Sequence, residues 1–398
     1  MPPRLLAATT CPMMATLPPS KSDNTTPARR QGFFGVRRGR PKLAINLALQ
    51  GGGAHGAFTW GVLDRLADEP SLEFGWISAT SAGAVNAAAF AAGLAEGGPA
   101  GAKAKLRDIW EAVHKAGVPD LLRLNPFLAG ISRSGTMAQM AQLFSPYDFN
   151  PLGFDPLRRL LETHIDFALL RRVKGPELLI AATDVATGAT RLFRRAEITV
   201  EAVLASACLP TLHHAVRIDN AAYWDGGFSA NPDLVTLARE SPIGDTLLVQ
   251  LTPFVKPGVP TGAREIAAHV NHLTFNAPLI REIEMLQLIR QGRTRRFWAR
   301  DPDRRVLDHR FHLIDASRYT ANLATDSQGK PELQMLNYLH GAGIAETGKW
   351  LERHLRQIGR LETADLGQRL AHARSRAALP EPVAAAAEPA SVTPGAAA

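Results

Sequence analysis

The stretch LAINLALQGGGAHGAFTWGVLDRLAD, residues 43–68, joins a strand pattern to a helix pattern through three consecutive glycines. Residues 43–49 form a short apolar run, which is typical of a strand buried on both faces. Behind the glycines, Phe58, Val62, Leu63 and Leu66 recur at the spacing of one helical face. The stretch therefore predicts a strand, a tight turn and a helix, which together begin a parallel βα unit.

A second unit of the same kind follows directly. FGWISA (residues 74–79) has the pattern of a buried strand, and AGAVNAAAFAAGLAEG (82–97) that of an Ala-rich helix ended by glycines. Further strands are predicted at 177–185, 245–253 and 310–316, and helices at 197–207, 262–296 and 331–358. This alternation predicts an α/β fold of three layers, with a central, mostly parallel sheet and helices on both faces.

The net charge of +8 is concentrated at one end of the chain. Residues 1–42 carry eight lysines and arginines against the single Asp23, so the remainder is nearly neutral. This leader is also rich in Pro, Ser and Thr, a composition typical of a solvated tail rather than of a nucleic-acid-binding surface. We expect disordered tails over 1–42 and, where Ala and Pro dominate, over 371–398, and no nucleic-acid partner.

The sequence indicates a cytoplasmic protein, with peripheral contact at the inner membrane face left open. The apolar run LLAATT is shorter than the core of a secretion signal, and no apolar run reaches the roughly 18 residues of a membrane span. The only cysteines, Cys11 and Cys208, do not provide a disulfide framework. Cys208 lies in an apolar segment and is expected to be an inert, buried thiol.

The glycine loop matches two motifs that imply different chemistry. Gly51, Gly53 and Gly56 have the spacing of the dinucleotide fingerprint G-x-G-x-x-G, yet the same amides also suit an oxyanion. A dinucleotide fold needs an acidic residue at the end of the second strand, whereas Glu73 precedes that strand. The strand instead ends in ATSAG (79–83), which puts Ser81 on a strand-to-helix turn, as in a nucleophile elbow.

A serine nucleophile needs a base, and the segment AAYWDGG (221–227) offers Asp225. Taken alone, Asp-Gly-Gly is a common turn. The unperturbed pKa of an aspartate, about 3.9, makes it a weak base. Burial beside Tyr223 and Trp224 is expected to raise the pKa of Asp225.

The ordered set GGGAHG (51–56), ATSAG (79–83) and ASACLPTLHHAVRIDNAAYWDGGFSANP (205–232) resembles the patatin-like phospholipases, and SPYDFNPL (145–152) resembles a segment of a bacterial branch. The resemblance implies a serine acyl hydrolase without cofactor or metal, acting on phospholipids or other acyl lipids. It implies Ser81 as nucleophile, Asp225 as general base and an oxyanion hole at Gly51, Gly52 and Gly53. It also implies supporting roles for Gly56, Ala79, Gly83, Gly226 and Gly227, where Ala79 departs from the usual glycine.

The same resemblance implies a patatin-like domain over 43–260, with a helical and α/β extension over 261–370 packed on it. Other readings stay open. One is a Ser-Asp-His triad esterase, thioesterase or storage-polyester hydrolase, with its base among His309, His312 and His340. Another is a nucleotide-binding oxidoreductase, and a third is a non-catalytic lipid-binding scaffold. The oligomeric state is left unassigned.

Two further segments have both a membrane interpretation and a structural one. Residues 117–151 mix turn residues with apolar ones and resemble a cap. Residues 288–305, LIRQGRTRRFWARDPDRR from Leu288 onward, combine arginines with Phe297 and Trp298, a pattern that suits anionic headgroups as well as a solvated helix end. We expect the structural interpretation for both: the apolar side chains of the first segment pack on the domain, and the second segment is a solvated helix end with its aromatic rings packed inward.

Overall fold

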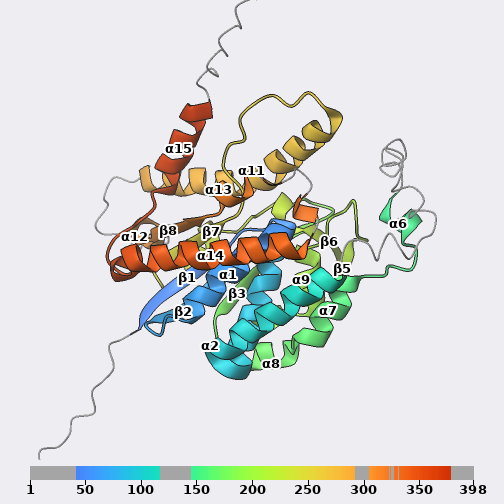
Figure 1. Ribbon diagram of the computed structural model, residues 1–398, viewed down its shortest axis with the longest axis horizontal. Coiled ribbons are helices and arrows are strands. Elements are labelled where there is room, and N and C mark those ends of the chain that lie inside the picture. Colours follow the sequence, from blue (N-terminus) through green and yellow to red (C-terminus); the bar gives the residue numbers. More distant parts are fainter. Residues whose placement is uncertain are drawn as a thin grey trace, which may run out of the picture. The chain divides into compact units, whose positions relative to one another are not determined.

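The computed structural model describes residues 42–116, 145–291 and 304–377, apart from 322, 324–326 and 330. These residues contain one eight-stranded sheet in the order β5-β6-β3-β2-β1-β7-β8, with β4 paired to β3 (Figure 1). The strands are β1 (Leu43–Leu49), β2 (Leu72–Thr80), β3 (Glu177–Asp184), β4 (Thr190–Arg194), β5 (Val216–Ile218), β6 (Ala221–Asp225), β7 (Asp245–Gln250) and β8 (Arg310–Asp315).

Five neighbouring strands of this sheet, β3, β2, β1, β7 and β8, run parallel. The three remaining strands pair antiparallel: β4 and β6 with β3, and β5 with β6. Sequence patterning predicts the parallel strands but misses β4 and β5. Both are short, and β4 (TRLFR) carries charged residues that hide the apolar pattern of a strand.

Helices cover both faces of the sheet. The α-helices are α1 (Gly56–Ala67), α2 (Ala82–Ala116), α6 (Pro146–Phe149), α7 (Pro156–His164), α8 (Phe167–Arg172), α9 (Val200–Ser206), α10 (Val235–Glu240), α11 (Ala263–Gln291), α12 (Arg304–Asp308), α13 (Ser317–Thr320), α14 (Leu333–His354) and α15 (Leu366–Ala377). Short 3-10 turns are η1 (Gly53–His55), η3 (Arg195–Glu197), η4 (Gly226–Phe228), η5 (Ser327–Gly329) and η6 (Leu355–Gln357).

Two hydrophobic cores separate the layers, because successive strand residues point to opposite faces. In β1, Leu47 and Leu49 join the core under α1, α2, α9 and α14, whereas Ala48 joins the core under α10, α11, α12 and α15. In β7, Leu248 likewise faces the second core and its neighbours the first. The predicted three-layer α/β fold is confirmed.

Two element boundaries differ from the sequence predictions. Helix α2 is broken at Gly97 and Gly98, where the predicted helix ends, but a second helical part continues to Ala116. Helix α15 runs to Ala377, past the residue at which the C-terminal tail was expected to begin. Leu366 and Leu370 pack into the second core, so the first turns of α15 are held by tertiary contacts that local composition does not reveal.

Candidate active site

Ser81 stands at the sharp turn between β2 and α2. Its φ is +55°, a conformation that a residue with a side chain adopts only at a cost. The Ser81 amide donates to Oγ of Ser206, 3.0 Å away at the end of α9, and the Ser81 carbonyl accepts from Ala84 and Val85 in the first turn of α2. The half-buried serine is therefore held in a strained elbow by both flanking segments.

Asp225 ends β6 and has no solvent exposure. Its amide donates to the carbonyl of Cys208 at 2.8 Å, and its carbonyl accepts from Oγ1 of Thr183 at 2.8 Å. On the side chain, Oδ1 accepts from the Gly227 amide at 2.7 Å, whereas Oδ2 has no hydrogen-bond partner among the described residues. One carboxylate oxygen is fixed by the backbone, and the other is unengaged.

Burial raises the pKa of Asp225 to about 7, against the lowering effect of the Gly227 amide and the Ser81 hydroxyl. The Ser81 hydroxyl thus lies within interaction range of the carboxylate. Oδ2 nevertheless has no hydrogen-bond partner among the described residues, so the contact with Ser81 is not a well-formed hydrogen bond. Catalytic hydrogen bonds are often long or poorly aligned before substrate binds.

The glycine loop lies against this pair, but its first amide is occupied. The Gly51 amide donates to Oδ1 of Asn231 at 2.7 Å, so it is not available as an oxyanion donor, contrary to the prediction for Gly51. A Cβ on Gly51 would lie only 2.8 Å from Cβ of Ser81. Gly51 therefore provides clearance beside the serine. The amides of Gly52 and Gly53 have no hydrogen bond within the described part of the chain.

Asn231, for which the sequence predicts no role, connects the glycine loop to α11. Besides accepting from Gly51, its Nδ2 donates to the carbonyl of Phe275 in α11 at 2.8 Å. Oγ1 of Thr80 donates to the neighbouring Ala230 carbonyl at 2.8 Å. These bonds tie the glycine loop, the end of β2 and the segment after Asp225 into one unit. Sequence reasoning misses them because they join residues far apart in the chain.

The remaining motif glycines are sites of close approach. A side chain at Gly83 would meet the carbonyl of Leu49 at the end of β1, and one at Gly226 would meet the carbonyl of Ala181 in β3. A side chain at Gly56 would meet Ala82 and Trp110, and one at Gly227 the ring of Phe275. Ala79 differs, because its methyl group is fully buried in the first core.

The three histidines considered as alternative bases have other partners. His312, in the middle of β8, bonds Oδ1 of Asp245 at 3.1 Å and Oγ1 of Thr363 at 2.8 Å. His309 bonds Oγ1 of Thr246 at 2.7 Å, and His340 bonds Oδ2 of Asp64 at 2.8 Å.

The sheet order also separates two of these histidines from the serine. Since β7 and β1 lie between β8 and β2, strand spacing alone puts β8 about 14 Å from the strand that carries Ser81. His309 and His312 are therefore not placed to serve Ser81.

The dinucleotide interpretation also conflicts with the geometry. Glu73 pairs with Ala44 near the start of β1, at the opposite end from the glycine loop. Turn η5 packs against one side of the loop, because a side chain at Gly53 would meet the carbonyl of Gln328. Nε2 of His55 bonds Oγ of Ser327 at 2.8 Å, and burial lowers the pKa of His55 to about 4.

Cys208 and His214, which lie near Asp225, make contacts typical of residues with a structural role. Cys208 is 2% exposed, its Sγ donates to the carbonyl of His214, and burial raises the pKa of its thiol to about 12. The ring of His214 stacks on Tyr147 of α6 at 4.0 Å. Among the described residues, no three histidines, cysteines or carboxylates are grouped so as to hold a metal ion.

The two segments with a membrane interpretation lie mostly outside the described residues. Of the cap-like segment 117–151, only 145–151 are described, including α6. Of the Arg-rich segment 288–305, residues 292–303 are not described. In the parts of the chain that are described, every helix is too short or too polar to serve as a transmembrane segment.

The chain is similar to a known protein family and to solved structures. Residues 47–238 match the family Patatin, described as patatin-like phospholipase. Among solved structures, the crystal structure of VipD from Legionella pneumophila is similar with a TM-score of 0.39 and 14% sequence identity, over 84% of this chain and 74% of that chain. No curated protein matches the chain.

Proposed function

Because residues 47–238 match the patatin-like phospholipase family, we propose that this protein hydrolyses carboxylic esters of acyl lipids through Ser81 and Asp225. The family match supports a lipid acyl hydrolase in general. The finer assignment is carried by one observation: a serine in a strained elbow lies within interaction range of a fully buried aspartate with a raised pKa.

The proposed reaction begins with attack of Ser81 Oγ on the ester carbonyl carbon. The serine proton passes to Oδ2 of Asp225, the oxygen without another partner among the described residues, while Oδ1 stays held by Gly227. Asp225 then returns the proton to the leaving alcohol as the ester C–O bond breaks. In the second half, water attacks the acyl-enzyme and Asp225 accepts the water proton. Asp225 then returns this proton to Ser81 Oγ as the bond between Oγ and the acyl group breaks and the carboxylic acid leaves.

The tetrahedral intermediates carry a negative oxygen that needs donors. We assign this role to the amides of Gly52 and Gly53, since the Gly51 amide is bonded to Asn231. Each donor in such a site contributes about 2.7–4 kcal/mol to transition-state stabilisation. The amino end of α2 directly behind Ser81 adds a favourable dipole.

A fluorophosphonate probe tests the nucleophile assignment. The probe reacts with activated serines, so the labelled peptide is expected to contain Ser81. Mass spectrometry of the digested protein measures the site, with heat-denatured protein as the unlabelled control. Labelling of a different serine would count against Ser81 as the nucleophile.

We further propose that the first half of α11 contacts the lipid surface. Ile266, Val270 and Leu273 are 44%, 53% and 58% exposed, and their spacing places them on one helical face. The helix next reaches Phe275 and Asn276, which contact the Asp225 loop and Gln50. The apolar face therefore lies within two or three helical turns of the site, and in Figure 1 this half of α11 extends past the strands.

Serine substitutions at Ile266, Val270 and Leu273 together are expected to lower hydrolysis of phospholipid vesicles about tenfold or more, because burying each side chain contributes up to about 1.5–3 kcal/mol. Hydrolysis of a soluble p-nitrophenyl ester should not change, since none of the three touches Ser81 or Asp225. The matched control replaces Met285 and Leu288, which are similarly exposed at the other end of α11. Equal loss on both substrates, or loss in the control, would contradict a lipid contact at this face.

A further inference from the structure

A cavity of about 380 Å³ lies beside the edge strand β8. Its walls come from β8, α13, α14 and α15, so it shares no residue with the Ser81 site. Strands β7 and β1 lie between β8 and β2, which separates the two sites across the sheet. The size is within the range of pockets that hold small organic ligands.

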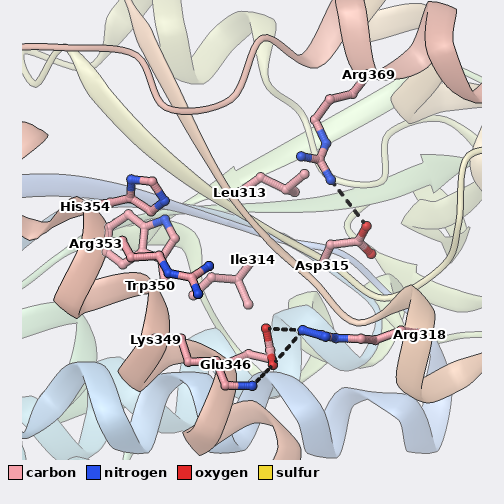
Figure 2. Close-up of a pocket in the computed structure, with 10 residues that line it drawn as sticks. All are labelled: Leu313, Ile314, Asp315, Arg318, Glu346, Lys349, Trp350, Arg353, His354 and Arg369. Carbon is pink, nitrogen blue, oxygen red and sulfur yellow. Dashed lines mark hydrogen bonds and ion pairs between the residues drawn. The ribbon is translucent and has the colours of Figure 1, made fainter.

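The charged lining of this cavity is dominated by cations. Four of the lining side chains are basic and two are acidic: Arg318, Lys349, Arg353 and Arg369, with Asp315 and Glu346. Figure 2 shows the four cations approaching from different sides. The excess of two positive charges in one cavity favours a dianionic ligand.

The ion pairs in the cavity do not neutralise all four basic side chains. Arg318 and Lys349 share a single carboxylate, Glu346, at 3.0 and 2.8 Å. Arg369 lies 3.7 Å from Asp315, which is too long for a hydrogen bond. Arg353 has no ion pair or hydrogen bond among the described residues, and its side chain is exposed. The guanidinium groups of Arg353 and Arg369 can therefore each donate two hydrogen bonds to the oxygen atoms of a ligand.

Trp350 contributes an apolar surface to the cavity. Its side chain lines the cavity and is 5% exposed. The indole is packed between the rings of His312, at 5.8 Å, and His354, at 6.1 Å, so it does not turn freely. Because Nε1 is buried, Trp350 offers a ligand its ring and not its N–H group.

We propose that this cavity binds the phosphate group of a phosphomonoester. A phosphate dianion matches the two excess charges, and its oxygens accept from the guanidinium groups of Arg353 and Arg369. Leu313, Ile314 and the Trp350 ring provide an apolar wall for the organic part of the ligand. The phosphate belongs either to a small soluble molecule or to a lipid headgroup.

The binding experiment uses the full-length protein and does not depend on its hydrolase activity. Calorimetric titration with glycerol 3-phosphate tests the soluble source. Sedimentation with phosphatidylcholine vesicles, with and without phosphatidic acid, tests the lipid source. The variants are Arg353→Gln and Arg369→Gln, each of which removes one guanidinium group from the lining. Arg356→Gln is the matched control, because Arg356 is exposed on η6 and does not line the cavity.

Binding of either probe that weakens about tenfold in both variants and stays unchanged in Arg356→Gln supports the proposal, since each variant removes one strong hydrogen bond to phosphate. Loss confined to glycerol 3-phosphate identifies a soluble ligand, and loss confined to the vesicles identifies a headgroup. The absence of binding to both probes, or binding that neither Arg353→Gln nor Arg369→Gln weakens, would overturn it.

Discussion

Replacement of Ser81 by alanine is expected to lower kcat for ester hydrolysis by about a millionfold, the loss seen when the nucleophile of a serine hydrolase is removed. Without Oγ no acyl-enzyme forms, and what remains is the contribution of oxyanion donors and substrate binding. The measurement is hydrolysis of a p-nitrophenyl ester and of a phospholipid by purified wild type and variant.

The fold should survive this substitution. Alanine keeps a Cβ at the positive φ of residue 81, so the elbow is as strained as before, and the backbone bond to Ser206 is retained. Thermal unfolding checks this point. Ser375→Ala is the control, because Ser375 bonds only the Ala371 carbonyl, in α15, and should leave turnover unchanged. A Ser81→Ala enzyme that kept a tenth of its activity would rule out the proposed nucleophile.

Replacement of Asp225 by asparagine is expected to lower kcat about ten-thousandfold, since an amide accepts no proton from serine. For the wild type, the base must be ionised. With the pKa of Asp225 raised to about 7 by burial, kcat/KM should rise with pH and reach half of its plateau near pH 7. A pH-rate profile between pH 5 and 9 measures this. A flat profile, or near-full activity of Asp225→Asn, would exclude Asp225 as the base.

The same substitution should also change stability in a way that a purely structural residue would not. Because the pKa of Asp225 is raised in the folded state, folding takes up a proton between about pH 4 and 7, and wild-type stability falls as pH rises through this window. Asparagine keeps an acceptor for Gly227 but does not ionise. Above pH 7 the variant should be more stable than wild type, by up to about 4 kcal/mol for a shift of about three pH units, and near pH 4 the two should converge.

Asp245 is a matched control, because its effect on stability changes with pH in the opposite direction. Burial alone would raise its pKa, but hydrogen bonds from His312 and Arg310 hold the pKa of this carboxyl well below its ordinary value. Its contribution to stability is therefore present at neutral pH and lost on acidification. Asp245→Asn should destabilise the protein at pH 7 and spare the chemistry at Ser81. Thermal unfolding of both variants between pH 2.5 and 8 compares the two signs, because the contribution of Asp245 is lost only below about pH 4, the ordinary pKa of an aspartate.

Local patterns were sufficient for the elements that build the sheet and the elbow. The buried strands β1, β2, β3, β7 and β8 each show as a short segment rich in apolar residues, and the small residues around Ser81 mark a turn with no room for larger side chains. The order of the residues also predicts that Glu73 lies at the wrong end of the second strand for a dinucleotide site. Strand β5 has three residues, which is too few to show the alternation of apolar and polar side chains that identifies a strand.

Local patterns establish the α/β class and the position of Ser81 after the second strand, because both follow from residues adjacent in the chain, whereas Asp225 became the candidate base through the resemblance to the patatin-like phospholipases. Packing between distant segments establishes that the Gly51 amide is bonded to Asn231, that Ser206 holds the elbow, that η5 packs against Gly53 and that burial raises the pKa of Asp225. The physical reason is that hydrogen bonds between segments more than a hundred residues apart, and the desolvation of a carboxylate, depend on packing and leave no periodic trace in the sequence.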